Sequence, residues 1–285
     1  MIDGLEVLCS QIEPDIERVV LEEGQRGAHF ERWINLLDTE RKLPAKLFYQ
    51  GHHDGRHKLV MVGTAGLGWK RTRRTIRTIF GDLESVTISR LDRCVDLLGI
   101  PIVSLVENCH VPRAQNIKMF RSRGGFSFYF QASKARTIVA YDKLGELRAK
   151  RNPRALLYSP TDTLTRLEIR LTGRALPFRT FVDLPRCVDV PAFKDLNIVS
   201  LHIGAYESMP KEFLQATGLR SLIKKHGLQT VSKMFSPPQW AYLKHKFFDR
   251  SVGLELPDFN LLERKTTQDW LEDRIRFPRL PVVID

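Results

Sequence analysis

The chain has 285 residues, 42% of them hydrophobic, which is enough for one large domain or two smaller ones with a substantial core. Lys and Arg number 45 against 33 Asp and Glu, and the net charge of +12 favours a polyanionic partner, nucleic acid before membrane, over a merely solvated basic surface. No apolar run reaches membrane-spanning length and the four cysteines lack Cys-x-x-Cys spacing, so we expect a cytoplasmic protein without a membrane or zinc site.

Hydrophobic periodicity predicts strands and helices in turn along the first part of the chain. In order, we predict a strand over residues 2–9, a helix over 14–38, a β-hairpin over 46–63, a helix over 68–82, a strand over 86–98 and a helix starting near Pro101. In the helix over 14–38, Trp33, Leu36 and Leu37 form an apolar stripe.

The later segments continue with strands and then become helical. We predict strands over 124–131 and 136–143, a short polar helix near 145–152, a strand over 163–173, a partly helical stretch over 176–193, a strand over 196–204 and helices from 210 onward. The sequence therefore predicts an α+β fold with a mostly antiparallel sheet and packed helices over 1–204. A basic helical C-terminal region over 205–285 follows it.

The segment GWKRTRRTIRTIFGD, residues 68–82, predicts a strongly basic helix, and no acid precedes Asp82 in it. Uncompensated cations on one short helix are unfavourable unless phosphates share them. We therefore interpret the helix as a DNA contact, with an ordinary solvated face as the alternative. Its cations are Lys70, Arg71, Arg73, Arg74 and Arg77.

A second basic group borders the aromatic strand in FRSRGGFSFYFQASKAR, residues 120–136. Cations beside aromatic rings suit single-stranded DNA, whose bases stack while its phosphates pair with the cations, although an ordinary β-hairpin is equally compatible. The cations are Arg121, Arg123, Lys134 and Arg136. In the C-terminal region, residues 219–235 faintly suggest a helix-turn-helix for duplex DNA, with nearby cations at Arg220, Lys224, Lys225, Lys233, Lys244 and Lys246.

Period-two alternation places charge on one face of three predicted strands. These polar faces carry Arg90, Asp92, Cys94 and Asp96 in the strand over 86–98, Arg166, Glu168 and Arg170 in the strand over 163–173, and Val139, Tyr141 and Lys143 in the strand over 136–143. If the strands are neighbours, carboxylates, a lysine and a tyrosine gather on one sheet face. Charge pairs between strands are the alternative interpretation.

Carboxylates from separate strands are typical ligands of Mg²⁺ or Mn²⁺, which keep open positions for a phosphate. A tyrosine and a lysine on the same side suit covalent phosphoryl transfer through a phosphotyrosyl link. Asp92 and Glu168 each follow an arginine by two positions, so ion pairing is their competing role. Tyr242, in the basic segment WAYLKHKFF, is the second candidate nucleophile, but no carboxylate cluster surrounds it in the sequence.

The segments TISRLDRCVD, IVAYDKLGE and LTRLEIRL, in this order and with a Phe/Tyr-rich strand after the first, resemble the replication initiation factor superfamily. That group includes rolling-circle initiators of plasmids, replication proteins of filamentous phages and related relaxases of conjugative elements. The phage proteins look most similar because they share the tyrosine, lysine and glutamate at the same spacing. The resemblance covers residues 86–172, and the His-hydrophobe-His motif of many other rolling-circle nucleases does not occur here.

Such proteins nick one strand at an origin, keep the 5′ phosphate on a tyrosine and leave a 3′ hydroxyl that primes synthesis. Position by position, the resemblance implies Tyr141 as nucleophile, Lys143 as an aid at the phosphate, Asp92 and Glu168 as ligands of Mg²⁺ or Mn²⁺, and Asp96 and Glu146 as less certain ligands. It also implies origin DNA, single-stranded at the nick, as the partner, with host helicase and polymerase as further partners.

We therefore expect a rolling-circle replication initiator of a phage or plasmid, acting in the cytoplasm of a bacterial host. A mobilisation relaxase with the same chemistry is one alternative, and a non-catalytic origin-binding or regulatory protein is another. One tyrosine performs one transfer at a time, so strand closure needs a second protomer, as in a dimer, a second residue, or hydrolysis.

Overall fold

Ten strands form one sheet in the computed structural model, which describes residues 1–37, 44–64, 67–111, 116–122, 124–194, 196–198, 200–201, 208–249 and 257–274. They are β1 (Ile2–Cys9), β2 (Gln25–Arg26), β3 (Phe30–Leu37), β4 (Pro44–Gly51), β5 (His57–Val62), β6 (Thr87–Leu98), β8 (Asn116–Ser122), β9 (Gly125–Ser133), β10 (Arg136–Asp142) and β11 (Leu164–Thr172). Their order is β2-β3-β4-β5-β1-β6-β11-β10-β9-β8. The pairs with a described register are antiparallel, which confirms the predicted α+β class with a mostly antiparallel sheet.

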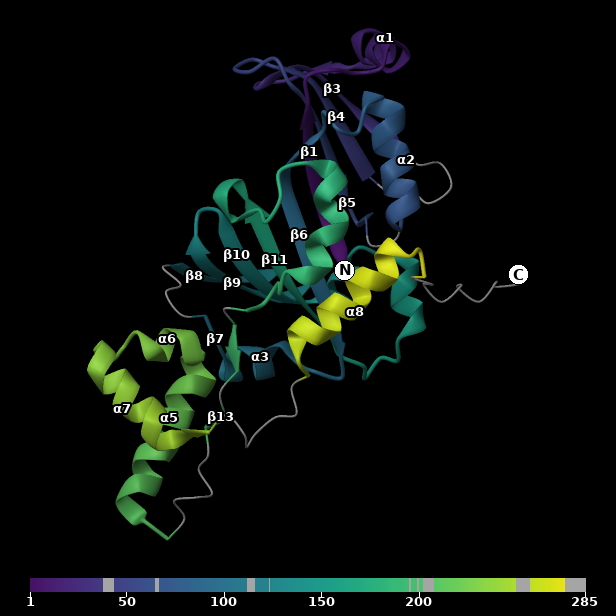
Figure 1. The fold of residues 1–285 in the computed structure, drawn as a ribbon. Coiled ribbons are helices and arrows are strands. Elements are labelled where there is room, and N and C mark those ends of the chain that lie inside the picture. The colour runs from purple at the N-terminus through teal and green to yellow at the C-terminus, as the bar shows by residue number, and fades with distance from the viewer. Residues whose placement is uncertain are drawn as a thin grey trace, which may run out of the picture. The chain divides into compact units, whose positions relative to one another are not determined.

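Helices and two short ladders complete the described chain (Figure 1). The helices are α1 (Pro14–Glu23), α2 (Trp69–Phe80), α3 (Ile102–Asn108), α4 (Lys143–Ala149), α5 (Pro210–His226), α6 (Leu228–Ser232), α7 (Pro237–Phe247) and α8 (Phe259–Leu271). The 3₁₀ segments are Pro153–Leu157, Gly173–Ala175 and Phe181–Asp189. The ladders pair β7 (Cys109–His110) with β12 (Asn197–Ile198), and β13 (Ser200–Leu201) with β14 (Phe248–Asp249). Among the described helices, none has the length and apolar character needed to cross a membrane.

Two compact units divide the chain, and each is assembled from separate segments. The first unit comprises Met1–Val95, Glu168–Ala192 and the described residues from Asn260 onward, and the second comprises Asp96–Leu167 and Phe193–Phe259. Strands β6 and β11 pass from one unit into the other within their own length. The helices after residue 205 are therefore divided between the two units: α5, α6 and α7 belong to the second unit, and nearly all of α8 belongs to the first.

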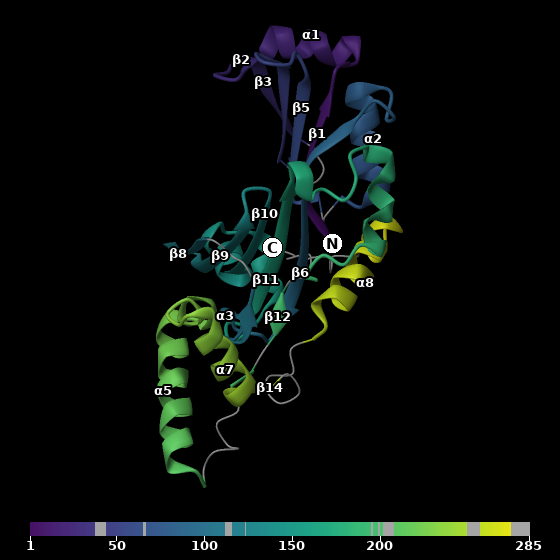
Figure 2. The same ribbon diagram turned by 60° about the vertical axis from the view of Figure 1, so that its left-hand side comes forward.

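Helix α2 shows how the sequence builds the first unit. Its positions Thr72, Ile76, Ile79 and Phe80 follow the helical period and are all buried. The helix ends at Gly81, whose φ of +73° is a conformation that glycine adopts readily. Helix α2 lies alongside β1 and β5 in both views (Figures 1 and 2), as predicted for a helix packed on a sheet.

The helix predicted over residues 14–38 is wrong after Glu23. Gly24 has extended backbone angles, φ −72° and ψ 140°, and ends α1 there. The segment that follows pairs as strand β3, with Trp33 opposite Phe48 of β4. The apolar residues of the predicted helical stripe therefore lie in a strand. Pairing with β4, and not a helical period, determines which of them are covered. Residue 38 lies outside the described residues.

The second unit contains an antiparallel meander, β8–β9–β10, and the helices α5, α6 and α7. These helices have a buried core of their own, formed by Ala216, Leu219, Ile223, Leu228, Val231 and Phe247. The strand predicted over 196–204 is present only as the two-residue strands β12 and β13, and residues 199 and 202–204 lie outside the described residues. The remaining predicted elements between 46 and 193 are present with shifted ends.

Candidate functional site

Charged side chains form a row across neighbouring strands of the first unit. Lys58 Nζ of β5 lies 2.6 Å from one carboxylate oxygen of Glu6 on β1, and Arg90 Nη1 of β6 donates to the other oxygen over 3.3 Å. Arg90 also donates to both carboxylate oxygens of Asp92, over 2.8 and 2.6 Å. Acids and cations therefore alternate along this row, and its best-buried carboxylates are the two predicted metal ligands described next.

Asp92 is a buried carboxylate that other groups keep in place. It is 6% exposed, and burial raises its pKa to about 6; the charge of Glu168 adds to this effect, while the hydrogen bonds from Arg90 oppose it. Gly4 lies opposite Asp92 in the β1–β6 ladder, and a Cβ at Gly4 would stand 2.5 Å from Asp92 Oδ2. The glycine at position 4 thus leaves the space that the Asp92 carboxylate occupies.

Glu168 is the second buried carboxylate of the row. It is 4% exposed on β11 and accepts a hydrogen bond from Arg170 Nε over 2.5 Å. Strands β6 and β11 are neighbours in the sheet, the charge of Glu168 acts on Asp92, and each carboxylate is held by an arginine of its own strand. For Glu168 that arginine is the one after it, whereas the competing prediction named the one before.

The donor set around Asp92 and Glu168 fits a limited kind of metal site. In the described part of the chain, no group of three or more His, Cys, Asp and Glu side chains is arranged to hold a metal ion. Mg²⁺ is commonly bound through one or two carboxylates, with water and substrate phosphate completing its coordination. Asp92 and Glu168 supply two carboxylates, and in the structure each of them is bound by an arginine.

Tyr141 and Lys143 lie where β10 gives way to α4, in the second unit. Tyr141 is the next-to-last residue of the strand, and Asp142 caps the helix by accepting the Gly145 N–H over 2.8 Å. Lys143 is the first residue of α4, so its predicted place in the strand is wrong: the cap starts a helix there. Lys143 Nζ nevertheless lies 5.6 Å from the centre of the Tyr141 ring. The turn thus brings a cation to the predicted nucleophile.

Glu146 fixes the position of this lysine. Lys143 Nζ donates to Glu146 Oε2 over 2.8 Å, and Lys150 Nζ donates to Oε1 over 2.5 Å. Burial alone would raise the pKa of Glu146, but the two lysines outweigh it and lower the pKa below its ordinary value. Glu146 is therefore an anionic anchor for Lys143, a role that competes with the ligand role implied by the resemblance.

Asp96, the third predicted ligand, belongs to the second unit with Tyr141 and Lys143. Arg166 donates to both of its carboxylate oxygens, over 2.6 and 2.7 Å. Burial alone would raise the pKa of Asp96, but the charges of Arg166 and Lys143 lower it. The structure thus brings Asp92 and Glu168 together in one unit, and Tyr141, Lys143 and Asp96 are all in the other.

The face of the meander that carries Tyr141 also carries exposed aromatic surface. Tyr141 is opposite Ser127 of β9, which is opposite Phe120 of β8, so the three side chains share one face. Phe120 is 52% exposed and meets the edge of Tyr129 at 5.2 Å between ring centres. Planar rings beside a predicted nucleophile suit a strand whose bases can stack.

The cations predicted to border this aromatic strand are only partly described. Arg121 is exposed and lies 5.5 Å from the ring of Phe126, on the opposite face of the meander from Tyr141. Lys134 is exposed at the β9–β10 turn, and Arg136 is half-buried. Arg123 lies outside the described residues.

Helix α2 presents its cations to solvent, as the sequence predicts. Lys70, Arg73, Arg74 and Arg77 are exposed, and Arg71 is half-buried. Within the described residues none of the four exposed cations forms an ion pair. The surface of α2 is therefore a continuous positive patch on the first unit.

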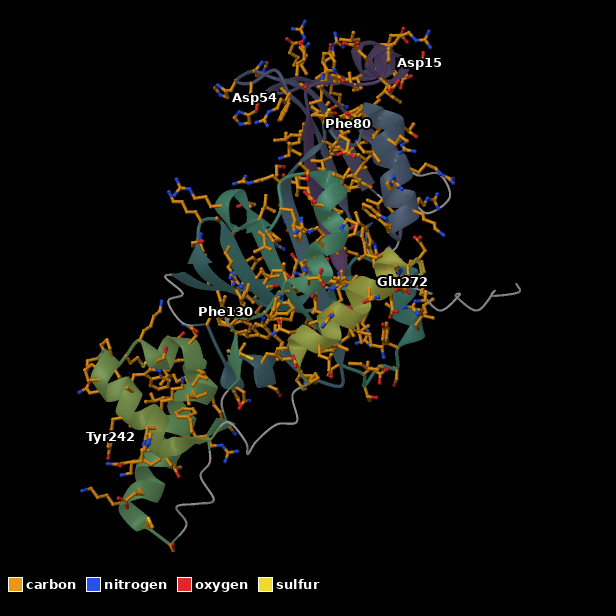
Figure 3. The ribbon with its side chains drawn as sticks, viewed as in Figure 1. Asp15, Asp54, Phe80, Phe130, Tyr242 and Glu272 are labelled. Atoms are coloured by element: carbon orange, nitrogen blue, oxygen red, sulfur yellow. The ribbon has the colours of Figure 1, made fainter. Side chains whose placement is uncertain are left out.

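Tyr242, the second candidate nucleophile, is 61% exposed on α7 (Figure 3). Lys246 Nζ lies 5.7 Å from its ring centre and also 3.5 Å from Glu212 Oε1. Tyr242 thus has a cation and an acid nearby on the exposed surface of a helix. Tyr141, in contrast, lies at the junction of a strand and a helix.

The protein is thus an α+β protein with a large antiparallel sheet. One of its units contains two buried carboxylates, and the other contains a tyrosine with a lysine beside its ring. No family model and no curated protein matches the chain.

Proposed function

We propose that the protein is a DNA strand transferase that initiates rolling-circle replication through a 5′-phosphotyrosyl intermediate. The observation that carries this proposal is the position of Lys143 Nζ beside the Tyr141 ring at a junction fixed by Asp142 and Glu146. In the reaction, the Tyr141 oxygen attacks the scissile phosphorus and the bond from phosphorus to the 3′ oxygen breaks. The phenol proton ends on the released 3′ hydroxyl, and the reverse reaction joins the strand.

The other residues have supporting roles in this proposal. The positive charge of Lys143 stabilises the phenolate and the charge that builds up on the phosphate. Asp92 and Glu168 would hold Mg²⁺ or Mn²⁺, an ion that would supply Lewis-acid chemistry toward phosphate oxygens. Asp96 is the weaker third ligand candidate, because Arg166 already binds both of its oxygens.

A denaturing-gel assay on labelled, single-stranded origin fragments tests the proposal. Wild-type protein is expected to yield a DNA adduct that a protease removes, in the presence of Mg²⁺ or Mn²⁺ and not with EDTA. If no fragment gives an adduct while the protein still binds DNA, the alternative of a non-catalytic origin-binding protein takes its place. A primer-extension assay and a transfer assay with the parent element then separate an initiator from a relaxase.

The metal proposal predicts that Mg²⁺ or Mn²⁺ stabilises the wild-type protein but not the Asp92→Asn variant. A ligand that binds only the folded state adds about 2.7 kcal/mol to the free energy of unfolding at about 100 times its dissociation constant. Thermal melting with and without the metal measures this without any activity assay. Glu6→Gln is the matched control, since it removes another acid of the same row and should keep the metal effect. A metal shift that persists in Asp92→Asn would count against the assignment.

Without metal, Asp92→Asn is expected to stabilise the protein above pH 6. The pKa of Asp92 rises from 3.8 to about 6 in the folded state, so the folded protein binds the proton more tightly than the unfolded chain does. Stability from this group therefore falls as the pH rises from about 4 to 6, by up to about 3 kcal/mol. Urea unfolding at pH 5 and pH 8 should show this fall in the wild type and a smaller one in the variant. Equal falls would contradict the expectation.

The patch on α2 is expected to control the salt dependence of DNA binding. Each phosphate contact contributes about 0.7–0.9 to the slope of log K against log salt, so changing Arg73, Arg74 and Arg77 to Gln should reduce that slope by about 2–3. Fluorescence anisotropy over a NaCl series measures it. The control triple, Arg18, Arg56 and Arg186 to Gln, removes the same charge from exposed arginines that pair with neighbouring acids. An equal drop in both triples would refute a local contact on α2.

A further inference from the structure

Helices α5, α6 and α7 lie side by side in both views (Figures 1 and 2) and pack as a three-helix group. The ring of Trp240 on α7 stacks with Phe235 at 6.3 Å and meets Phe248 at 5.5 Å. These rings pack against the buried core that α5 and α6 supply. The three helices thus form one layer with a fixed internal geometry.

Helix α6 is the inner helix of this group. Leu228, Val231 and Ser232 are buried. The side-chain amide of Gln229 hydrogen-bonds to both the N–H and the C=O of Val111. Gln229 Oε1 accepts the Val111 N–H over 2.7 Å, and Nε2 donates to the Val111 carbonyl over 3.0 Å. A helix held in this way is not available as a binding surface, so the exposed surface of the group belongs to α5 and α7.

A four-residue turn, Lys233 to Ser236, joins α6 to α7. Ser236 and Gln239 form a capping box that fixes the start of α7. Two helices joined by a turn of three or four residues are the arrangement of a helix-turn-helix, in which the second helix enters the major groove. A helix-turn-helix built from these elements would have its turn after α6, later than the motif predicted over residues 219–235 implies, and α7 as its second helix.

Helix α7 has one face for the core and one for solvent. Trp240, Leu243 and Phe247 recur at i, i+3 and i+7 and face the core. The exposed residues are Pro237, Pro238, Gln239, Ala241, Tyr242 and His245. The phenol of Tyr242 and the imidazole of His245 are the groups on this face that can hydrogen-bond to base edges, whereas the amide oxygen of Gln239 is engaged in the capping box.

The three-helix group carries a net positive charge. Residues 208–249 contain seven Lys and Arg and two acids, Glu212 and Asp249, which gives a charge of +5. Arg220, Lys224 and Lys225 are exposed on α5. This charge complements the phosphates that flank a groove.

We propose that α5, α6 and α7 form a helix-turn-helix module that binds duplex DNA, with α7 reading base edges and α5 contacting phosphates. The module's role does not depend on Tyr141 being the nucleophile. It would place the protein on duplex DNA, whereas the transfer chemistry needs a single strand.

The test uses the full chain carrying Tyr141→Phe, so that duplex binding is measured without covalent chemistry. Duplexes are selected from a random pool, and anisotropy then compares a selected duplex, a scrambled duplex and a single strand of equal length. Tyr242→Ala and His245→Ala should each reduce the preference for the selected duplex by about tenfold or more. Changing Arg220, Lys224 and Lys225 to Gln should weaken both duplexes alike and lower their salt slopes by about 2–3.

The control triple of Arg18, Arg56 and Arg186 should leave duplex preference unchanged. Circular dichroism and hydrogen exchange of peptides from α5, α6 and α7 show whether each variant keeps the three-helix core, and these surface changes are not expected to disturb it. The proposal is overturned if no duplex sequence is enriched, if Tyr242→Ala and His245→Ala keep the full preference, or if the α5 triple weakens single-strand binding as much as duplex binding.

Discussion

Tyr141→Phe is expected to eliminate covalent capture of DNA while DNA binding persists. The change removes the attacking oxygen and leaves the ring beside Lys143. Loss of a covalent nucleophile lowers turnover by up to about six orders of magnitude in well-studied cases, which is below detection on a gel. The measurement is the yield of protease-sensitive adduct with Mg²⁺ on labelled single-stranded origin DNA, together with anisotropy on the same fragment. Retained affinity with no adduct is the expected pair of results.

Matched variants make this result specific to position 141. Tyr129→Phe removes a hydroxyl from the same face of the meander and should keep full activity, as should Tyr242→Phe. Lys143→Gln should lower the adduct rate by about 10²–10³ and not abolish it, since it removes one stabilising charge. If Tyr141→Phe still forms the adduct and Tyr242→Phe does not, the nucleophile is Tyr242 and the role assigned to the β10–α4 junction is wrong.

Arg93→Met is expected to destabilise the first unit by about 3–5 kcal/mol, because it leaves a buried carboxylate without its guanidinium. Arg93 on β6 is 1% exposed and donates to both oxygens of Glu263 on α8, over 2.9 and 2.5 Å. It also donates to the Val190 carbonyl over 2.6 Å. Hydrogen exchange of peptides from β1 and β5 in a urea series reports the stability of this unit separately from that of the other.

The double variant Arg93→Met with Glu263→Leu should recover part of the loss, since an apolar pair often replaces a buried ion pair without penalty, while the Met1 ammonium loses its carboxylate partner. Breaking the exposed Arg56–Asp54 pair should change stability by about 0–1 kcal/mol. A loss of that small size in Arg93→Met would show that the buried pair adds little.

Acid should reveal the same pair in the wild type. Burial alone would raise the pKa of Glu263, but the Met1 ammonium and Arg93 outweigh it and lower the pKa. Its contribution is therefore complete above the ordinary value of 4.5 and is lost as the pH falls through the lower folded-state value. A pH series of the same exchange measurement should show this loss in the wild type and its absence in the double variant.

Most of the secondary structure can be predicted from the local pattern of hydrophobic residues, and the helix predicted over residues 14–38 shows where that pattern fails. Alternation in β1 and the helical period in α2 reproduce the observed elements, because the buried residues of each recur with the period of its own secondary structure. The segment after Glu23 misled the prediction because its apolar residues fit either period, and only pairing with β4 decides between them. Pairing brings distant segments together and leaves no local signal.

The candidate site divides in the same way. Residue types, alternation and the family resemblance selected Asp92, Glu168, Tyr141 and Lys143 as candidates, but not the groups that hold them in place. Glu6 became part of the charged row only because β1 lies between β5 and β6, an order that sequence does not reveal. Sequence did not single out Gly4 either, because its lack of a side chain matters only to Asp92, its neighbour across the β1–β6 ladder.

The buried Arg93 also occupies a position that alternation reserves for apolar residues, between Leu91 and Val95 on β6. Nothing local to β6 indicates its partner, which follows 170 residues later. Buried ion pairs of this kind are therefore the part of a fold that single-sequence reasoning misses most easily.

That separation has a consequence for how the protein is made. Ribosomes add about 5–20 residues per second, so Arg93 emerges on the order of ten to thirty seconds before Glu263 does. During that interval the first unit lacks α8, and the guanidinium has no carboxylate to neutralise it. A nascent chain stalled before residue 260 should therefore expose the surroundings of Arg93 to proteases and chaperones. Once α8 has left the ribosome, Glu263 can pair with Arg93 and cover them.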